Sequence, residues 1–225
     1  MQKSLNLAIA LSICLFTLPA VADTMEQQIA QVQNEWARIK YQVPDKKTQL
    51  EDIAKLEDDS TKLTAAFPDR AEPKIWQAIV LSTDAGIING ISGLPKLKTA
   101  KKLLEAAIAI SPDALEGSAQ TSLGSLYYQV PGWPISFGDN KKADTYLQAA
   151  LKTNPDGIDA NFFYGDFLAR AGQYDKAVPV LEHALMAPPR PGRELADTGR
   201  RQEIKAAIAK AREELNSHKQ KSALN

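Results

Sequence analysis

One spacing occurs three times in this sequence and constrains the fold more than any other feature. An alanine is followed 12 residues later by a proline at Ala100 and Pro112, at Ala143 and Pro155, and at Ala177 and Pro189. The prolines are 43 and 34 residues apart, and the alanines keep the same intervals. Self-similarity at a period of roughly 20–50 residues is typical of solenoids built from stacked units.

The last unit is the most regular, and residues 161–189 read NFFYGDFLARAGQYDKAVPVLEHALMAPP. Small Gly165 and Ala177 let two antiparallel helices approach closely, and Gly172 is placed to end the first helix. This segment resembles a tetratricopeptide repeat, whose pattern is W-x2-L-G-x2-Y, then A-x3-F, then P. The matching positions are Tyr164, Gly165, Leu168, Ala177, Leu181, Ala184 and Pro189, with Asn161 in place of the leading tryptophan.

The resemblance implies an all-α fold, an antiparallel helical-hairpin solenoid with three repeats at about residues 72–112, 116–155 and 158–189. A degenerate helical hairpin is expected before them, at residues 24–40 and 46–66. An amphipathic helix at residues 194–216 is expected to cap the array. Residues 23–225 then make up a single domain.

The first two repeats carry insertions. From the glycine position of the first helix to the alanine of the second, the last repeat takes 12 residues, the middle one takes 19 and the first takes 20. In the first repeat Val80 stands at the glycine position, because Trp76 and Ile79 match the start of the pattern. Seven or eight extra residues therefore lie in the turn between the helices of these two repeats.

The middle insertion, residues 129–140, contains Trp133, Ile135 and Phe137 between prolines and glycines. Two interpretations are open: the aromatic residues anchor a partner, or they fold back over the gap between repeats. The first insertion, residues 86–93, has three glycines around Asn89, which favours a structural turn or a close approach of backbone to a ligand. Equivalent positions of neighbouring repeats adjoin, so we expect the insertions to touch and to form one platform.

The concave groove is the other candidate surface, and its positions follow from the family resemblance. They are Lys74, Gln77, Leu81, Asp84, Ser118, Thr121, Ser125, Tyr128, Asp159, Phe162, Asp166 and Arg170. This set is mixed in chemistry and nearly neutral, and it lacks the basic clamp with which some members of the family hold a C-terminal carboxylate.

Signals for catalysis are scarce. The sequence has two histidines, His183 and His218, which do not indicate a metal site. Ser136 stands near a glycine but lacks the strand of a nucleophile elbow. Two interpretations are open for Arg190, Arg193, Arg200 and Arg201: they hold an acidic partner, or, as we expect, they are dispersed and solvated. We expect no enzyme activity, no metal and no cofactor.

Residues 1–22 predict the compartment. A positive Lys3, an apolar stretch from Leu5 to Leu18 and the triplet Ala20-Val21-Ala22 are typical of a signal peptide that is cut after Ala22. Cys14, the single cysteine, would leave with it. The 27 basic residues balance the 27 acidic ones, which argues against nucleic acid as a partner. No later apolar stretch approaches bilayer length, so we expect a periplasmic or secreted protein without membrane insertion.

These observations predict a non-enzymatic scaffold that binds a protein or peptide partner. The alternative is an accessory protein of a periplasmic transport system that binds a small molecule. The chain is loosely similar to the helical T-component that accompanies tripartite ATP-independent periplasmic (TRAP) transporters. Native mass spectrometry of protein from the periplasm would separate the two functions.

Overall fold

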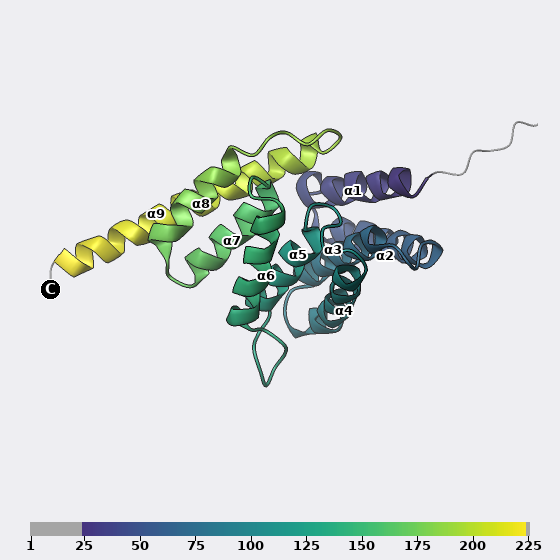
Figure 1. The fold of residues 1–225 in the computed structure, drawn as a ribbon, viewed down its shortest axis with the longest axis horizontal. Helices are drawn as coiled ribbons and strands as arrows, with labels where there is room; N and C mark the ends of the chain where they lie inside the picture. Colours follow the sequence, from purple (N-terminus) through teal and green to yellow (C-terminus); the bar gives the residue numbers. More distant parts are fainter. Residues whose placement is uncertain (1–23, 224–225) are drawn as a thin grey trace, which may run out of the picture.

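The computed structural model describes residues 24–223, so the predicted signal segment lies outside the described residues. Within this range the chain forms α-helices and one short 3-10 helix, which confirms the predicted all-α class (Figure 1). The α-helices are α1 (Met25–Gln42), α2 (Lys46–Ala66), α3 (Ala71–Ile88), α4 (Leu94–Ile110), α5 (Ser118–Gln129), α6 (Asn140–Thr153), α7 (Ile158–Arg170), α8 (Tyr174–Leu185) and α9 (Glu194–Ala223), and the 3-10 helix η1 is Ile91–Gly93. None of the helices in this range is long and apolar enough to cross a membrane.

The three predicted repeats are the helical pairs α3 and α4, α5 and α6, and α7 and α8, each of which is in contact along its length. The second helix of each pair presents the same buried stripe, because alanine and leucine recur on one face. Every member of this stripe has no exposed surface: Ala100, Leu104, Ala107, Ala143, Leu147, Ala150, Ala177, Leu181 and Ala184. The alanine spacing therefore marks the core of the solenoid.

Glycine brings the two helices of a repeat together in the second and third repeats. A Cβ atom added to Gly124 would lie 2.7 Å from Leu147 Cγ, and one added to Gly165 would lie 2.6 Å from Leu181 Cγ. Real Cβ atoms do not approach other atoms this closely, so a larger residue would push the helices apart. The predicted role of Gly165 is confirmed.

The predicted N-terminal hairpin is formed by α1 and α2. Thr24 starts α1 with a capping box, in which its side chain accepts from the backbone of Gln27 and the Gln27 side chain accepts from the backbone of Thr24. The side chain of Asp45 caps α2. Trp36 of α1 packs edge-on against Trp76 of α3, with 5.9 Å between the ring centroids, which joins this hairpin to the first repeat.

Helix α9 begins at Glu194 as expected but continues to Ala223, beyond the predicted end at residue 216. It covers α8 and α7, as a capping helix does, and it also contacts α1 at the opposite end of the chain. Gly199 lies against the ring of Tyr41, and Lys40 Nζ pairs with a Glu203 carboxylate oxygen at 3.0 Å. The first and last helices therefore close the array, an arrangement that the sequence did not predict.

Candidate functional site

A cavity of about 1020 Å³ lies on the concave side of the array. The helices α3, α5 and α7 line it at positions that are spaced by three, four and four residues. These positions are Trp76, Ile79, Thr83 and Ile87 on α3, Ser118, Thr121, Ser125 and Gln129 on α5, and Asp159, Phe162, Asp166 and Arg170 on α7. The shared spacing means that equivalent faces of the three first helices look into the same space.

Of the predicted groove positions, all four on α7 and three of four on α5 border the cavity. Phe162, Asp166 and Arg170 all border the cavity. Tyr128 does not border the cavity. Its hydroxyl donates to Asp166 Oδ2 at 2.7 Å, however, and so positions the side chain of Asp166, which does border the cavity. Burial and the neighbouring charge of Asp166 raise the pKa of Tyr128, which keeps the hydroxyl protonated as a donor.

The groove prediction is wrong for the first repeat. The cavity is not bordered by Lys74, Gln77, Leu81 or Asp84. The residues that lie two or three positions later in α3 border it instead. Asp84 is buried instead between α3 and α4, where Lys96 Nζ lies 2.7 Å from Asp84 Oδ2.

Apolar side chains form one wall of the cavity. Trp36 and Trp76 meet there, and Ile79, Ile87 and Leu126 continue the wall along α3 and α5. The indole N–H of Trp36 donates to Thr83 Oγ1 at 2.8 Å, which fixes the ring. Such a wall is suited to apolar or aromatic groups of a ligand.

Another wall is charged, and it is built from segments far apart in the sequence. Arg200 is only 5% exposed, and its Nε donates to Asp159 Oδ1 at 2.7 Å. Arg190 Nη1 donates to Asp159 Oδ2 at 2.7 Å, and Arg190 also pairs with the buried Asp197. Arg201 donates to the backbone oxygens of Leu185 and Ala187. The expectation of dispersed, solvated arginines is therefore wrong for these side chains.

Asp159 is held ionised by its neighbours. Burial alone would raise the pKa of this carboxyl group, but the positive charges of Arg200 and Arg190 outweigh burial. The pKa of Asp159 therefore lies well below its ordinary value. Nearby, burial and the charge of Arg200 lower the pKa of Lys40, whose ammonium group pairs with Glu203.

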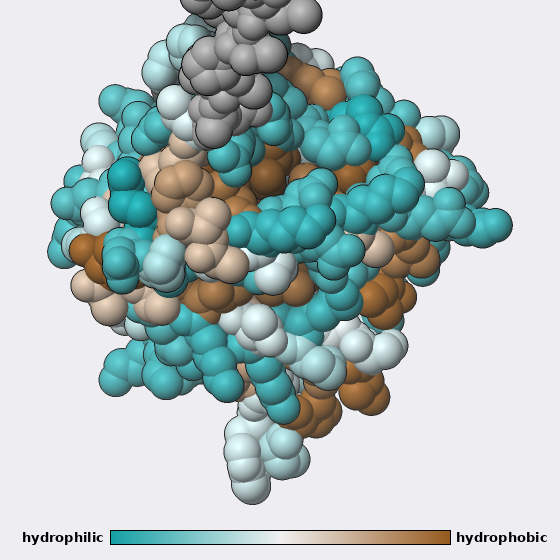
Figure 2. Space-filling model, turned by 90° about the vertical axis from the view of Figure 1, so that its right-hand side faces the viewer, coloured by the Kyte–Doolittle hydropathy of each residue, from teal (hydrophilic) through white to brown (hydrophobic). Residues whose placement is uncertain are grey.

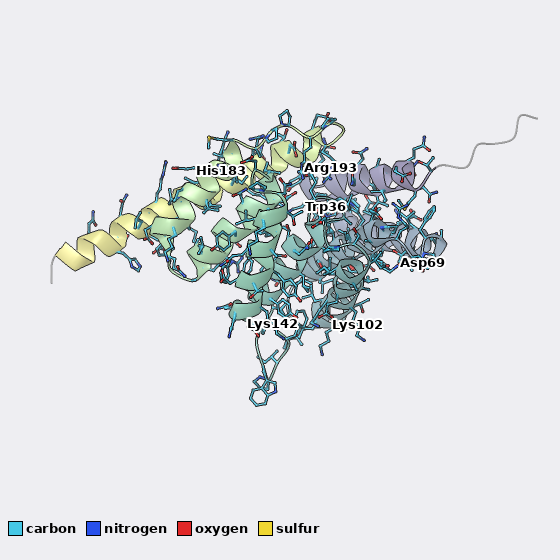
Figure 3. The ribbon with its side chains drawn as sticks, in the orientation of Figure 1. Trp36, Asp69, Lys102, Lys142, His183 and Arg193 are labelled. Atoms are coloured by element: carbon cyan, nitrogen blue, oxygen red, sulfur yellow. The ribbon has the colours of Figure 1, made fainter. Side chains whose placement is uncertain are left out.

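Arg193 differs from Arg190 and Arg200 because it forms no ion pair with any residue between 24 and 223. Its guanidinium carbon lies 5.0 Å from the centroid of the Trp76 ring. Burial, and then the charge of Arg190, lower the pKa of Arg193. Figure 3 shows Arg193 and Trp36 close together beneath the start of α9, where both border the cavity. A half-buried cation without an anion is placed to bind one.

The first insertion borders this cavity along most of its length, and the second insertion borders it only with its first residues. Asn89 and Gly90, both with positive φ, border the cavity from the first insertion, and Val130 and Pro131 border it from the second. The residues that follow in the second insertion are not among the lining residues.

The three apolar residues of the second insertion have different environments. Phe137 packs edge-on against Tyr127, with 5.8 Å between the ring centroids, so this ring folds back onto the repeat. Trp133 is 89% exposed and Ile135 is 60% exposed. The loop between α5 and α6 that carries them projects from the body of the molecule (Figure 1). The interpretation that the insertion folds back is therefore right for Phe137, and anchoring of a partner by Trp133 stays a prediction.

The remaining candidates contribute no chemistry to the cavity. His183 Nε2 lies 2.9 Å from Asp156 Oδ1 on an outer face. The Ser136 hydroxyl is buried and has no hydrogen-bond partner among the described residues. Residues 24–223 contain no group of three or more side chains that could hold a metal ion.

Comparison with known proteins identifies the repeat. Residues 135–197 match the family model of the tetratricopeptide repeat. The structure is similar to that of TTC0263, a thermophilic TPR protein in Thermus thermophilus, with a TM-score of 0.54, 20% identity, and coverage of 85% of this chain and 91% of that chain. Two further similar structures are MamA, with a TM-score of 0.44, 21% identity and coverage of 78% and 96%, and Pseudomonas aeruginosa pilF, with a TM-score of 0.34, 15% identity and coverage of 82% and 90%. The comparison with curated proteins gave no match.

Proposed function

Since this chain folds as a tetratricopeptide-repeat solenoid, we propose that it is a periplasmic scaffold that binds a segment of a partner protein in its cavity and catalyses no reaction. The fold itself is that of a protein-interaction scaffold. The observation that carries the finer proposal is the cavity, because α3, α5 and α7 line it with equivalent positions. An extended segment that crosses the three helices would meet the same face of each in turn.

The chemistry of the walls defines the segment. Trp36, Trp76 and Ile79 favour apolar side chains, and the hydroxyl oxygens of Thr121 and Ser125, which donate to backbone oxygens three or four residues earlier, can accept from the amides of an extended backbone. Arg193 has no carboxylate partner among the described residues, so a single acidic group on the segment would complete its charge balance. We therefore propose a segment with apolar residues and one carboxylate.

Photo-crosslinking tests this function. A small photo-reactive side chain in place of Ser122, which borders the cavity, is expected to crosslink to a polypeptide in cells. The same group in place of Thr198, on the exposed face of α9, serves as the control and is expected to give no such product. Equal crosslinking from both positions would contradict binding in the cavity.

The role of Arg193 is tested by substitution. Arg193→Gln is expected to lower the affinity for the partner, and with it the yield of crosslinked product, about tenfold or more. The reason is that a charge-assisted hydrogen bond is worth roughly 1.5–3 kcal/mol. Arg212→Gln, which removes an arginine on the exposed part of α9, is the matched control.

Native mass spectrometry of protein from its own periplasm separates the scaffold function from the transport accessory function. A retained small molecule in place of a polypeptide would favour the transport accessory function and overturn the scaffold.

The periplasmic location rests on residues 1–22, and it is tested separately. N-terminal sequencing of the protein from a periplasmic fraction is expected to begin at Asp23, because small residues stand at the first and third positions before it. Recovery of the chain from the cytoplasm with Met1 intact would overturn this part of the proposal and leave the cavity unaffected.

A further inference from the structure

The loop between α5 and α6 ends in an exposed apolar tip, residues 132–135. Trp133 and Ile135 of the tip are 89% and 60% exposed, and residues 130–138 carry no charged side chain. Figure 2 shows the projection from a second direction, standing out at the bottom of the molecule with hydrophilic side chains just above it. Two large apolar side chains exposed at the end of a projection indicate an interaction site, whereas the polar side chains of an ordinary solvated loop do not.

The base of the loop holds the tip in place. The amide of Gly138 donates to the Pro131 oxygen at 3.0 Å, and the amide of Asp139 donates to the Tyr127 oxygen at 2.8 Å. A Cβ atom on Gly138 would lie 2.0 Å from the Val130 oxygen, so the two sides of the loop close here without a side chain between them. Because the base is already ordered, little conformational freedom is left to lose when the tip meets its partner.

Lysines surround the base. Lys101 Nζ lies 5.9 Å from the Phe137 ring centroid, and Lys142 Nζ lies 5.5 Å from the Tyr127 ring centroid. Lys102 and Lys141 are their exposed neighbours in the sequence, and Figure 3 shows Lys102 and Lys142 near the point where the loop leaves the body.

Few carboxylates offset these lysines. Glu105 pairs with Lys101 at 2.6 Å, and Asp139 accepts from backbone amides at the start of α6. Lys102, Lys141 and Lys142 form no ion pair with any residue from 24 to 223. The base therefore carries an excess of positive charge directly behind the apolar tip.

We propose that the tip docks this protein on the surface of an anionic lipid bilayer, with Trp133 and Ile135 entering the interface and the lysines meeting the headgroups. Tryptophan favours this depth because its ring is apolar and its N–H remains hydrated. An apolar face needs to enter only about 5–10 Å, which a projecting loop can do. Each lysine near an anionic leaflet strengthens binding about fivefold.

A protein partner fits the tip less well. A stable protein interface buries about 800 Å² on each partner. Two side chains of this size bury roughly 300–400 Å² together, and lysines, which are depleted in the cores of protein interfaces, surround them. The docking surface lies outside the cavity, so the proposal is independent of what the cavity binds.

Fluorescence quenching with vesicles tests the proposal on the full chain. The vesicles contain phosphatidylcholine alone, or with about one third phosphatidylglycerol, and carry acyl chains brominated near the headgroup. We expect stronger quenching of wild-type emission than of Trp133→Ala emission, because Trp36 and Trp76 are buried in both proteins. The difference in quenching between the two proteins reports on Trp133 alone, because any contribution of residues 1–22 to vesicle binding is the same in both.

Partitioning to the same vesicles provides the second measurement. The double variant Trp133→Ala and Ile135→Ala is expected to bind anionic vesicles at least about tenfold more weakly. The double variant Lys141→Gln and Lys142→Gln should lose about 25-fold, fivefold for each lysine. Lys46→Gln with Lys47→Gln, a pair at the exposed start of α2, is the matched control and should bind as the wild type does.

Two outcomes would overturn the proposal. Equal quenching of wild type and Trp133→Ala would show that the tip does not meet lipid, and would leave a protein as its partner. Equal binding to neutral and anionic vesicles would show that the lysines do not contribute. Circular dichroism of each variant establishes that the fold is retained, as expected for exposed positions.

Discussion

Gly199 of α9 lies directly against the ring of Tyr41 of α1. A Cβ atom on Gly199 would stand 2.4 Å from Tyr41 Cδ1 and 2.5 Å from two further ring atoms. The Tyr41 ring cannot easily move away, because it packs edge-on against Trp36 at 6.0 Å between centroids. This glycine therefore sets how closely the last helix approaches the first.

Gly199→Ala tests this closure. The added methyl group must push α9 away from α1, and overpacking of this kind costs about 1–3 kcal/mol. We expect a lower midpoint in urea unfolding although alanine favours helix over glycine by about 0.5–1 kcal/mol. Thr198→Ala, at the exposed neighbouring position, is the control and should change little. A more stable Gly199→Ala protein would mean that the two helices are not held together at this point.

Gly165→Ala tests the approach of the helices within a repeat. Its Cβ would lie 2.6 Å from Leu181 Cγ, so we expect a loss of about 1–3 kcal/mol in the free energy of unfolding. Gly86→Ala is the opposite case, because no atom lies within 4 Å of the added Cβ. That substitution in α3 should stabilise the protein by about 0.5–1 kcal/mol. Thermal unfolding of both variants measures the contrast in sign.

Asp159→Asn tests the charged wall. At pH 7 it leaves Arg200 and Arg190 without their shared carboxylate, and breaking such a partly buried pair costs several kcal/mol, roughly 3–5. The pKa of Asp159 is depressed in the folded state, so the unfolded state, with a pKa of about 3.9, takes up the proton first. The stability that Asp159 provides is therefore fully present above about pH 4 and is lost as the pH falls below it.

Urea unfolding of wild type and Asp159→Asn from pH 7 to pH 3 measures this effect. The difference between the two proteins should be largest near neutral pH and should shrink in acid. Asp175→Asn, which changes an exposed aspartate of α8 that forms no ion pair with any described residue, is the control. A difference that stays constant with pH would show that Asp159 does not act through its charge.

Lys96→Met tests the ion pair beneath the first insertion. Lys96 Nζ lies 2.7 Å from Asp84 Oδ2 and 2.6 Å from Glu57 Oε2, and Asp84 is buried. Without the ammonium group two carboxylates face each other, which should cost about 3–5 kcal/mol at neutral pH. Lys98→Met, which changes an exposed lysine of the same helix that forms no ion pair with any described residue, is the control.

This loss should also shrink as the pH falls, but for a different reason from that of Asp159→Asn, because here the folded variant takes up the proton first. Burial already raises the pKa of Glu57 in the wild type, and removal of Lys96 raises it further. A carboxyl group with a raised pKa takes up its proton in the folded state first, so lowering the pH stabilises the folded form. The destabilisation of Lys96→Met, followed by chemical unfolding, should therefore decrease between pH 7 and pH 5.

Phe137→Ala and Trp133→Ala should separate the two halves of the middle insertion. Phe137 packs on Tyr127 and is half-buried, so its removal should cost roughly half of the 3–5 kcal/mol of a buried phenylalanine. Trp133 is almost fully exposed, so Trp133→Ala should leave the free energy of unfolding within about 0.5 kcal/mol of wild type. Equal losses would contradict the observed environments.

The second helices of the repeats could be predicted because their signal is local. Ala100, Ala143 and Ala177 each start a stripe in which small and large residues alternate at helical spacing, and packing density requires that pattern. The groove positions of the first helix of the first repeat were placed two or three residues too early. Trp76 looked like the leading tryptophan of the pattern, but it packs on Trp36 and borders the cavity instead.

The charged wall could not be predicted by periodicity, since Asp159, Arg190 and Arg200 lie on three separate segments. These three side chains converge because α9 returns to contact α1. The repeat pattern does not predict the direction that α9 takes. One local signal was available. Gly199 is a glycine inside an otherwise helix-favouring and charged segment, and such a residue often marks the close approach of another element.

The contact between α1 and α9 has a consequence for how this architecture can change. An open solenoid can be lengthened by adding units at either end, since each unit touches only its neighbours. Here an added unit would carry α9 away from α1 and separate Gly199 from Tyr41 and Glu203 from Lys40. The number of repeats is therefore fixed by the closure, and variation in this scaffold is confined to the inserted loops, whose length the closure does not constrain.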